Sequence, residues 1–311
     1  MRVTPSSFSN SLVDQLDLLA SQQNHLQNEV STGRRIQTPD DDPAGVSLVM
    51  GWQAEGQSLA QYQQNIASLQ TQATASYNAI NSLKTISDRA GEIATLADGT
   101  KSAQDLKSYA IEVTQLIQQA VQMANSQQDG SYLFGGTRTN QPPFTVTTDA
   151  NGVVTGVTYQ GNAATAGVEV DQNMTVSALT PGANTSGTGP QGLITDSRSG
   201  ADFFNHLISL QNHLQAGNTA GIANTDRAAL SQDENNLVAQ IASNGALQSR
   251  LDAASALASS RATAITGQIS NEADANLADT IMQLNQTQTA YQAAIQSGAS
   301  IMRQSLLDYL Q

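Results

Sequence analysis

The chain has 311 residues and a formal net charge of −13, with only 13 lysines and arginines. That charge disfavours binding to nucleic acid and to anionic membrane surfaces, because both need clustered cations. The absence of cysteine excludes disulfides, thiol catalysis and cysteine-ligated metals. Charged residues make up 13% and aromatic residues 4% of the chain, so we expect a core of small and aliphatic side chains, as in long helices laid side by side.

Neither a cleaved signal nor a membrane span is expected. Residues 1–23 contain no continuous apolar stretch followed by a small-residue cleavage site. No stretch of the sequence reaches the roughly 18 apolar residues of a membrane helix. The chain is therefore expected either to stay in the cytoplasm or to leave by a route that reads no cleaved signal.

The first predicted helix ends at Thr32-Gly33, since glycine is a natural helix stop. Its apolar residues recur every seven positions in two rows, with one polar layer at Gln23. The rows consist of Leu12, Leu19 and Leu26, and of Leu16 and Val30. This spacing predicts an amphipathic helix of the coiled-coil kind.

Two more helices are predicted before the pattern changes. One runs from Pro43 to Asp98-Gly99 on heptad rows, and the other carries an apolar face from Leu106 to Ala124. Residues 138–195 instead have the pattern of short strands. Alternating residues at 144–148, then Asn151-Gly152, then β-branched residues are typical of a hairpin.

Helical spacing returns at Phe203 and is most regular in the last segment. One heptad row there begins at Leu277 and another at Ile281. We therefore predict a mainly α fold with an inserted β-domain. A discontinuous α-helical bundle or coiled coil comes from residues 1–137 and 196–311, and residues 138–195 form a small β-rich outer domain.

The two terminal helical segments have little to bury against except each other or a neighbouring copy, so each alone is marginal in water. We expect them to support self-association, with an intramolecular bundle as the alternative. Burial of each large aliphatic side chain contributes about 1.5–3 kcal/mol before ordering costs. The candidate residues are Leu12, Leu16, Leu19, Leu26, Leu277, Ile281, Leu284, Tyr291, Ile295, Met302 and Leu306.

Residues 31–45, STGRRIQTPDDDPAG, join the first two helices through a cluster of charges. A calcium loop is excluded, because counting from Asp40 puts Ala44 at the fifth position and Gly51 at the twelfth, where ligands are needed. Instead Asp42 suits an N-cap and Pro43 the first helical position. The segment is predicted to be a helix corner with an ionic lock, formed by Gly33, Arg34, Arg35, Asp40, Asp41, Asp42 and Pro43.

Other candidate chemistry lacks support. Residues 187–192 match G-x-G-x-x-G, but no buried strand precedes them, so a linker is the better interpretation. Asp202 and His206 are spaced for one helix face, yet no third ligand completes a metal or catalytic site. We expect no cofactor, no metal and no enzymatic activity.

The corner and the C-terminal segment together resemble the flagellin superfamily. Residues 31–45 resemble its corner signature, a Ser-x-Gly-x-Arg-Ile and then Asp-Asp pattern between two long helices, and residues 277–310 look like its terminal helix. Three features are more similar to a member that joins the hook to the filament than to a filament-forming flagellin. They are Pro43 after the acids, SYLFGGT at 131–137 and the ending LLDYL at 306–310. A short flagellin that forms the filament itself remains the alternative.

The resemblance implies a structural adaptor of the bacterial flagellum, outside the cell at the hook–filament junction. It implies unfolded export through the flagellar type III channel, with a cytoplasmic export chaperone on residues 277–310. The partners it implies are other copies in a ring, a neighbouring hook-associated protein and flagellin, with the β-domain facing outward. The corner residues are expected to set the hairpin angle and to face neighbouring subunits.

Overall fold

A computed structural model describes residues 5–150 and 152–309 of the chain, and the side chains of residues 10–150 and 152–300. The chain divides into two compact units. The terminal unit comprises residues 1–59 and 260–311, and the central unit comprises residues 60–259. Among the described helices, none combines the length and the hydropathy that crossing a membrane requires.

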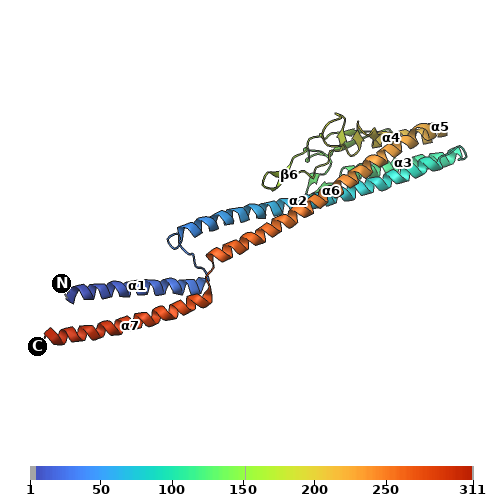
Figure 1. Cartoon of the computed structure of the whole chain (residues 1–311). Helices are drawn as coiled ribbons and strands as arrows, with labels where there is room; N and C mark the ends of the chain where they lie inside the picture. The colour runs from blue at the N-terminus through green and yellow to red at the C-terminus, as the bar shows by residue number, and fades with distance from the viewer. Residues whose placement is uncertain (1–4, 151, 310–311) are drawn as a thin grey trace. The chain divides into compact units, whose positions relative to one another are not determined.

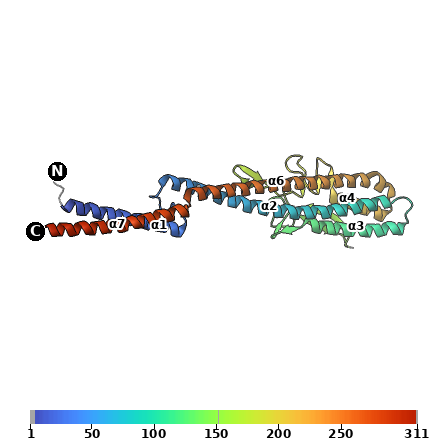
Figure 2. The ribbon, with the colours of Figure 1, turned by 60° about the horizontal axis from the view of Figure 1, so that its bottom comes forward.

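The terminal unit is built from the two ends of the chain. Helices α1 (Pro5–Thr32) and α7 (Leu277–Tyr309) lie side by side in both views (Figures 1 and 2). The unit also contains the first part of α2 (Pro43–Leu96) and the last part of α6 (Arg227–Ala273). Gly33 follows α1 with φ +70°, a left-handed conformation that glycine adopts without strain. The predicted end of the first helix at Thr32-Gly33 and the predicted start of the second at Pro43 are both confirmed.

The central unit adds two long helices and one irregular turn. Helix α3 (Ala103–Ala124) begins with a capping box between Ser102 and Asp105, and α4 (Phe203–Ala216) ends at Gly217, whose φ is +68°. The chain then enters α6 through the short α5 (Thr219–Gly221) and the π-helical turn η1 (Ile222–Asp226).

The described strands of the central unit form four small sheets. Three are antiparallel hairpins: β1 (Gln127–Gln128) with β2 (Ser131–Tyr132), β3 (Phe144–Thr148) with β4 (Val154–Tyr159), and β5 (Val168–Asp171) with β6 (Met174–Val176). In the fourth, β8 (Thr195–Asp196) pairs parallel to β7 (Ala183–Asn184) and antiparallel to β9 (Ala201–Asp202). The predicted hairpin is confirmed on either side of its turn, where Asn151 lies outside the described residues.

One continuous cluster of buried apolar side chains holds the central unit together. Ile80, Ile117 and Leu207 bring α2, α3 and α4 into it, each with no exposed surface, and Leu230 and Leu237 of α6 join them. Phe144 of β3 packs on Phe204 with ring centroids 5.4 Å apart, so the β-rich segment shares the helical core. The predicted fold class, mainly α with an inserted β-rich part, is confirmed.

Residues 138–195 lie wholly inside the central unit. Their division from residues 1–137 and 196–311 as a separate outer domain therefore stays a prediction.

Candidate functional site: the terminal helix pair and its corner

The corner between α1 and α2 is organised by two of its three aspartates. Asp42 caps α2, because its Oδ1 accepts the backbone N–H of Gly45 at 3.0 Å and Pro43 is the first helical residue. Asp41 Oδ2 accepts the N–H groups of Thr38 and Gln37 at 2.7 and 2.9 Å. These backbone hydrogen bonds lower the pKa of Asp41, and that of Asp42 is lowered by Gly45 N–H and then by Arg35. Both carboxylates thus act as structural acceptors.

Arg35 supplies the ionic lock that the sequence predicts, and it extends the lock to a third helix. Its guanidinium lies 3.3 Å from Asp42 Oδ2 and 3.2 Å from Glu272 Oε1, and it also donates to the Glu272 carbonyl at 2.7 Å. Within the described residues, the side chains of Arg34 and Asp40 make no hydrogen bond or ion pair, and both residues are exposed. Arg34 and Asp40 are therefore open to solvent, next to the ion pairs of Arg35 and the hydrogen bonds of Asp41 and Asp42.

Backbone hydrogen bonds fix the corner to the junction between α6 and α7. Arg35 N–H donates to the Ala273 carbonyl at 2.8 Å, and Ala275 N–H donates to the Gly33 carbonyl at 2.9 Å. Arg34 and Asp274 form an isolated antiparallel bridge between these two contacts. The end of α1 and the start of α7 are consequently held together by main-chain atoms, whatever side chains surround them.

The interface between α1 and α7 contains several small or polar side chains. Thr280 and Thr287 are buried on α7, and Thr280 Oγ1 lies 3.4 Å from Oε2 of the buried Glu29. Imidazole Nε2 of His25 lies 3.0 Å from the other oxygen of Glu29 and Nδ1 lies 3.8 Å from Asp41 Oδ1, which links α1 to the corner. This part of the interface therefore mixes buried polar side chains with the half-buried Leu284, which lies between Thr280 and Thr287 on α7.

Farther along the pair, close approach requires a glycine. A Cβ placed on Gly298 would lie 2.4 Å from Leu12 Cδ2, well inside contact distance. Gly298 is buried although it is a helical residue with no side chain of its own. Leu12 therefore packs directly on the backbone of α7.

The predicted self-association residues fall into three groups. Leu26 is buried at 4% exposure, and Leu12, Leu16, Leu19, Leu284 and Tyr291 are half-buried along the interface. Leu277, Ile281 and Ile295 are each 46% exposed. The side chains of Met302 and Leu306 lie outside the described residues. The row of α7 that faces α1 contains Thr280 and Thr287, one position before the predicted row of Ile281 and Gln288.

That displacement leaves apolar surface on the terminal unit. Besides Ile281 and Ile295, Leu18 of α1 and Met282 of α7 are 69% and 55% exposed. Leu48 and Met50, in the first turns of α2, are more than half exposed as well. Single exposed apolar residues are ordinary. Leu277, Ile281 and Ile295, however, recur at helical spacing on one face of α7, and an apolar face of this kind is typical of a surface that binds protein.

The histidines of α4 make structural pairs that the sequence did not predict. His206 Nδ1 lies 2.8 Å from Oδ2 of the buried Asp233, and His213 Nδ1 lies 2.7 Å from Oδ2 of the buried Asp226. The hydrogen bond to Asp233 raises the pKa of His206, while burial raises the pKa of Asp233. Asp202 is not a partner of His206 but faces Asn205, at 2.7 Å. In the described part of the chain, no three acidic or histidine side chains group as a metal would require.

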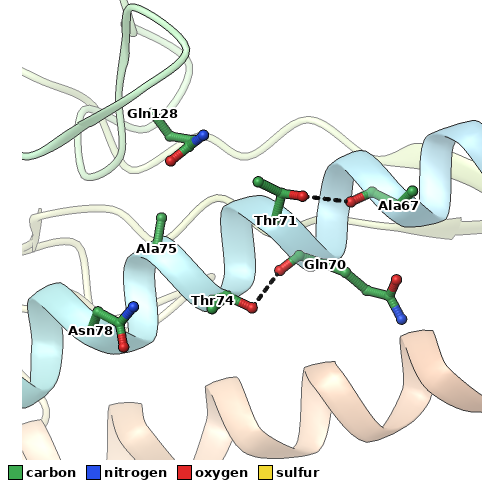
Figure 3. A pocket seen from close by; sticks show the side chains of 7 residues that line it. All are labelled: Ala67, Gln70, Thr71, Thr74, Ala75, Asn78 and Gln128. Atoms are coloured by element: carbon green, nitrogen blue, oxygen red, sulfur yellow. Dashed lines mark hydrogen bonds between the residues drawn. The ribbon is translucent and has the colours of Figure 1, made fainter.

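A groove on the central unit also lacks the marks of a reactive site. It has a volume of about 540 Å³ and lies along α2 opposite Gln128 (Figure 3). The hydroxyls of Thr71 and Thr74 donate to carbonyls of their own helix at 3.0 and 2.8 Å, and Gln70 donates to Asp252 at 2.8 Å. None of the described residues in its lining carries a charged side chain. The terminal helix pair is therefore the stronger candidate for function.

Comparison with known families agrees with this architecture. Residues 7–139, which include most of α1 and the whole of the corner, α2 and α3, match the family model of the bacterial flagellin N-terminal helical region. This match confirms the resemblance to the flagellin superfamily that the corner motif indicates. Flagellar hook-associated protein 3 of Salmonella typhimurium (strain LT2) is similar to this chain, with 26% identity over 297 residues that cover 90% of each chain.

Solved structures show the same fold. A putative flagellar hook-associated protein from Vibrio parahaemolyticus has a TM-score of 0.63 at 19% identity, over 75% of this chain and 100% of that one. FlgL of Bacillus cereus has a TM-score of 0.56 at 18% identity, over 71% and 99% of the two chains. The flagellar junction protein FlgL from Legionella pneumophila also reaches 0.56, at 13% identity over 73% and 99%.

Proposed function

We propose that this chain is a structural subunit of the bacterial flagellum that joins the hook to the filament. The observation that carries the proposal is the similarity to flagellar hook-associated protein 3, which extends over nine tenths of both chains. The shared fold with proteins named FlgL supports it. Known relatives are structural components of the flagellum, and the role proposed here needs no catalysis and no cofactor.

Assembly is proposed to proceed through the terminal helices. The main-chain contacts between Gly33 and Ala275 hold α1 and α7 as a pair, and the pair presents Leu277, Ile281 and Ile295 to solvent. Neighbouring copies in a ring, a second hook-associated protein on one side and flagellin on the other would cover these side chains. Burial of each contributes about 1.5–3 kcal/mol before ordering costs, so several contacts per subunit suffice for stable packing.

The route and place of action follow from the same resemblance. Export is proposed to occur in an unfolded state through the flagellar type III channel, after a cytoplasmic chaperone has held residues 277–310. The subunit then acts outside the cell, at the junction. The apolar character of Leu277, Ile281 and Met282 supports the chaperone proposal, because an isolated helix with this face needs a partner in water.

Deletion of the coding sequence in the source bacterium tests the proposal. Loss of a junction subunit predicts hooks without filaments in electron micrographs and flagellin monomers in the culture medium, both reversed by the wild-type chain. Normal filaments in the deletion strain would contradict the assignment.

A short flagellin that builds the filament itself is the second candidate, because the matched family model is that of the flagellin N-terminal region. Purified chain mixed with filament seeds separates the two. A flagellin elongates the seeds into long fibres, whereas a junction subunit leaves their length unchanged.

A further inference from the structure

A separate pocket in the central unit has the composition of a binding site. It has a volume of about 330 Å³, and α6 forms one wall while the loops at residues 177–181 and 190–191 form the other. That volume lies at the lower end of the range for small-molecule sites, roughly 300–1,000 Å³. It is sufficient for a single sugar ring or an amino acid.

Two buried side-chain amides of α6 line this pocket, and in each of them one of the two polar atoms makes no hydrogen bond within the described residues. Gln240 and Asn244 are 6% and 5% exposed, and their spacing of four residues puts them on one helix face. Gln240 Nε2 donates to the Gln191 carbonyl at 3.0 Å, and Asn244 Oδ1 accepts from Gln248 Nε2 at 2.7 Å. Within the described residues, Gln240 Oε1 and Asn244 Nδ2 have no hydrogen-bond partner, yet neither is sealed from solvent.

Gln240 Oε1 and Asn244 Nδ2 thus offer one acceptor and one donor to a molecule in the pocket, side by side on one helix. A ligand group that both donates and accepts would satisfy the two together. Neighbouring hydroxyls on a ring have this property. Ser243 lies between the two amides in the sequence and adds a further hydroxyl to the lining.

Arg250 adds a positive charge to the same pocket. No ion pair or hydrogen bond of its guanidinium is found in the part of the chain that the structure describes, although the chain has 26 acidic residues against 13 basic ones. None of the described residues that line the pocket is acidic. A free guanidinium is suited to a carboxylate, which it can bind through two parallel hydrogen bonds.

Leu179, Pro181 and Leu247 supply apolar walls beside these polar groups. From this combination we infer that the pocket binds a sugar acid: the carboxylate lies on Arg250, ring hydroxyls lie on Gln240 and Asn244, and the C–H face of the ring packs on the apolar wall. A peptide carboxylate would use Arg250 too, and its N–H and C=O groups would satisfy Gln240 and Asn244, so it is the competing ligand in the test below. The inference is independent of the role proposed for the terminal helices.

Titration of the ¹⁵N-labelled full chain with sodium galacturonate and with sodium glucuronate tests the inference by NMR. At least one of the two should shift the side-chain amide signals of Asn244 and Gln240 in a saturable way. Galactose, which lacks the carboxylate, should bind at least about tenfold more weakly. Arg250→Gln should weaken the sugar acid by a similar factor and leave the thermal unfolding midpoint unchanged.

Lys107→Gln is the matched control, since Lys107 is another exposed cation of the central unit with no ion pair among the described residues, and it does not line the pocket. It should bind the sugar acid like the wild type. Absence of saturable shifts with both sugar acids, or equal binding by Arg250→Gln, would overturn the inference. Tighter binding of an N-acetylated amino acid would overturn it as well and would assign the pocket to peptide carboxylates.

Discussion

The two units of the molecule differ in how much of their apolar side-chain surface they bury. In the central unit, Ile80, Ile117 and Leu207 are completely buried in one continuous cluster. In the terminal unit, Ile281 and Ile295 remain 46% exposed while Glu29, Thr280 and Thr287 take buried positions. The central unit therefore supplies its own stability, whereas the terminal unit leaves surface that only another molecule can cover.

Stability and assembly are therefore located in different units. A helix pair with a partly polar interface is marginal in water, because most helical stability comes from packing an apolar face. The corner contacts of Arg35, Asp41 and Asp42 keep the pair in place without making it stable by burial.

The largest effect is expected in the central core. Ile117→Ala should lower the free energy of unfolding by about 2–5 kcal/mol, because it leaves a cavity among fully buried neighbours. Leu284→Ala, in the half-buried interface of the terminal unit, should cost much less. Urea unfolding followed by circular dichroism measures both. Equal losses would break the contrast between the two units.

Close packing at Gly298 should matter for the terminal pair alone. Gly298→Val forces Leu12 aside and should cost about 1–3 kcal/mol of local stability. Native-state hydrogen exchange should then show faster exchange in α1 and α7. Gly267→Val is the control, because nothing lies within 4 Å of a Cβ at that position of α6. Unchanged exchange in the Gly298 variant would mean that Leu12 does not pack on α7 in solution.

The His206–Asp233 pair should make the central unit sensitive to alkaline pH. The hydrogen bond to Asp233 raises the folded-state pKa of His206 above its usual 6.5. While Asp233 is ionised, the contribution of protonated His206 to stability is therefore complete below about pH 6.5 and is lost as pH rises through the raised pKa of His206. The thermal midpoint should fall more between pH 6 and pH 9 in the wild type than in His206→Gln. An identical fall in both chains would contradict the pairing.

The smallest effect on folding is expected at the exposed face of α7. The double variant Ile281→Ser, Ile295→Ser should change the free energy of unfolding by no more than about 0.5 kcal/mol per site, since both side chains are nearly half exposed. It should nevertheless fail to restore filaments in the deletion strain.

The matched control for this variant is Ile111→Ser, which removes an isoleucine that is 64% exposed on α3 of the central unit. Filaments should return with this control. Restoration by the double variant would remove the terminal face from the assembly mechanism.

Local chemistry made much of the fold predictable from the sequence. Gly33 and Gly217 end helices in left-handed conformations, and Asp42-Pro43 starts one, as the capping rules require. The hairpin of β3 and β4 follows from its alternating residues. Each of these features depends on residues that are close together in the chain, so a single sequence is sufficient to predict it.

The interface of α7 could not be predicted in the same way. Apolar spacing favours Ile281 over Thr280, but the Thr280 hydroxyl donates to the Asn276 carbonyl at 3.0 Å and the Thr287 hydroxyl to the Gln283 carbonyl at 2.9 Å. With the hydroxyl satisfied inside its own helix, threonine is buried like a small apolar residue. The partners of His206 and His213 were missed because they lie 27 and 13 residues away on another element.

The main-chain contacts at the corner also have a topological consequence. The carbonyl of Gly33 binds the amide of Ala275, so the two points where the chain leaves α1 and enters α7 are adjacent. The residues between these two points form one long segment whose two ends are adjacent. Insertions or deletions within residues 60–259 can therefore change the length of this segment without altering the spacing of the terminal helices. A foreign domain grafted there would be carried on an unaltered helix pair.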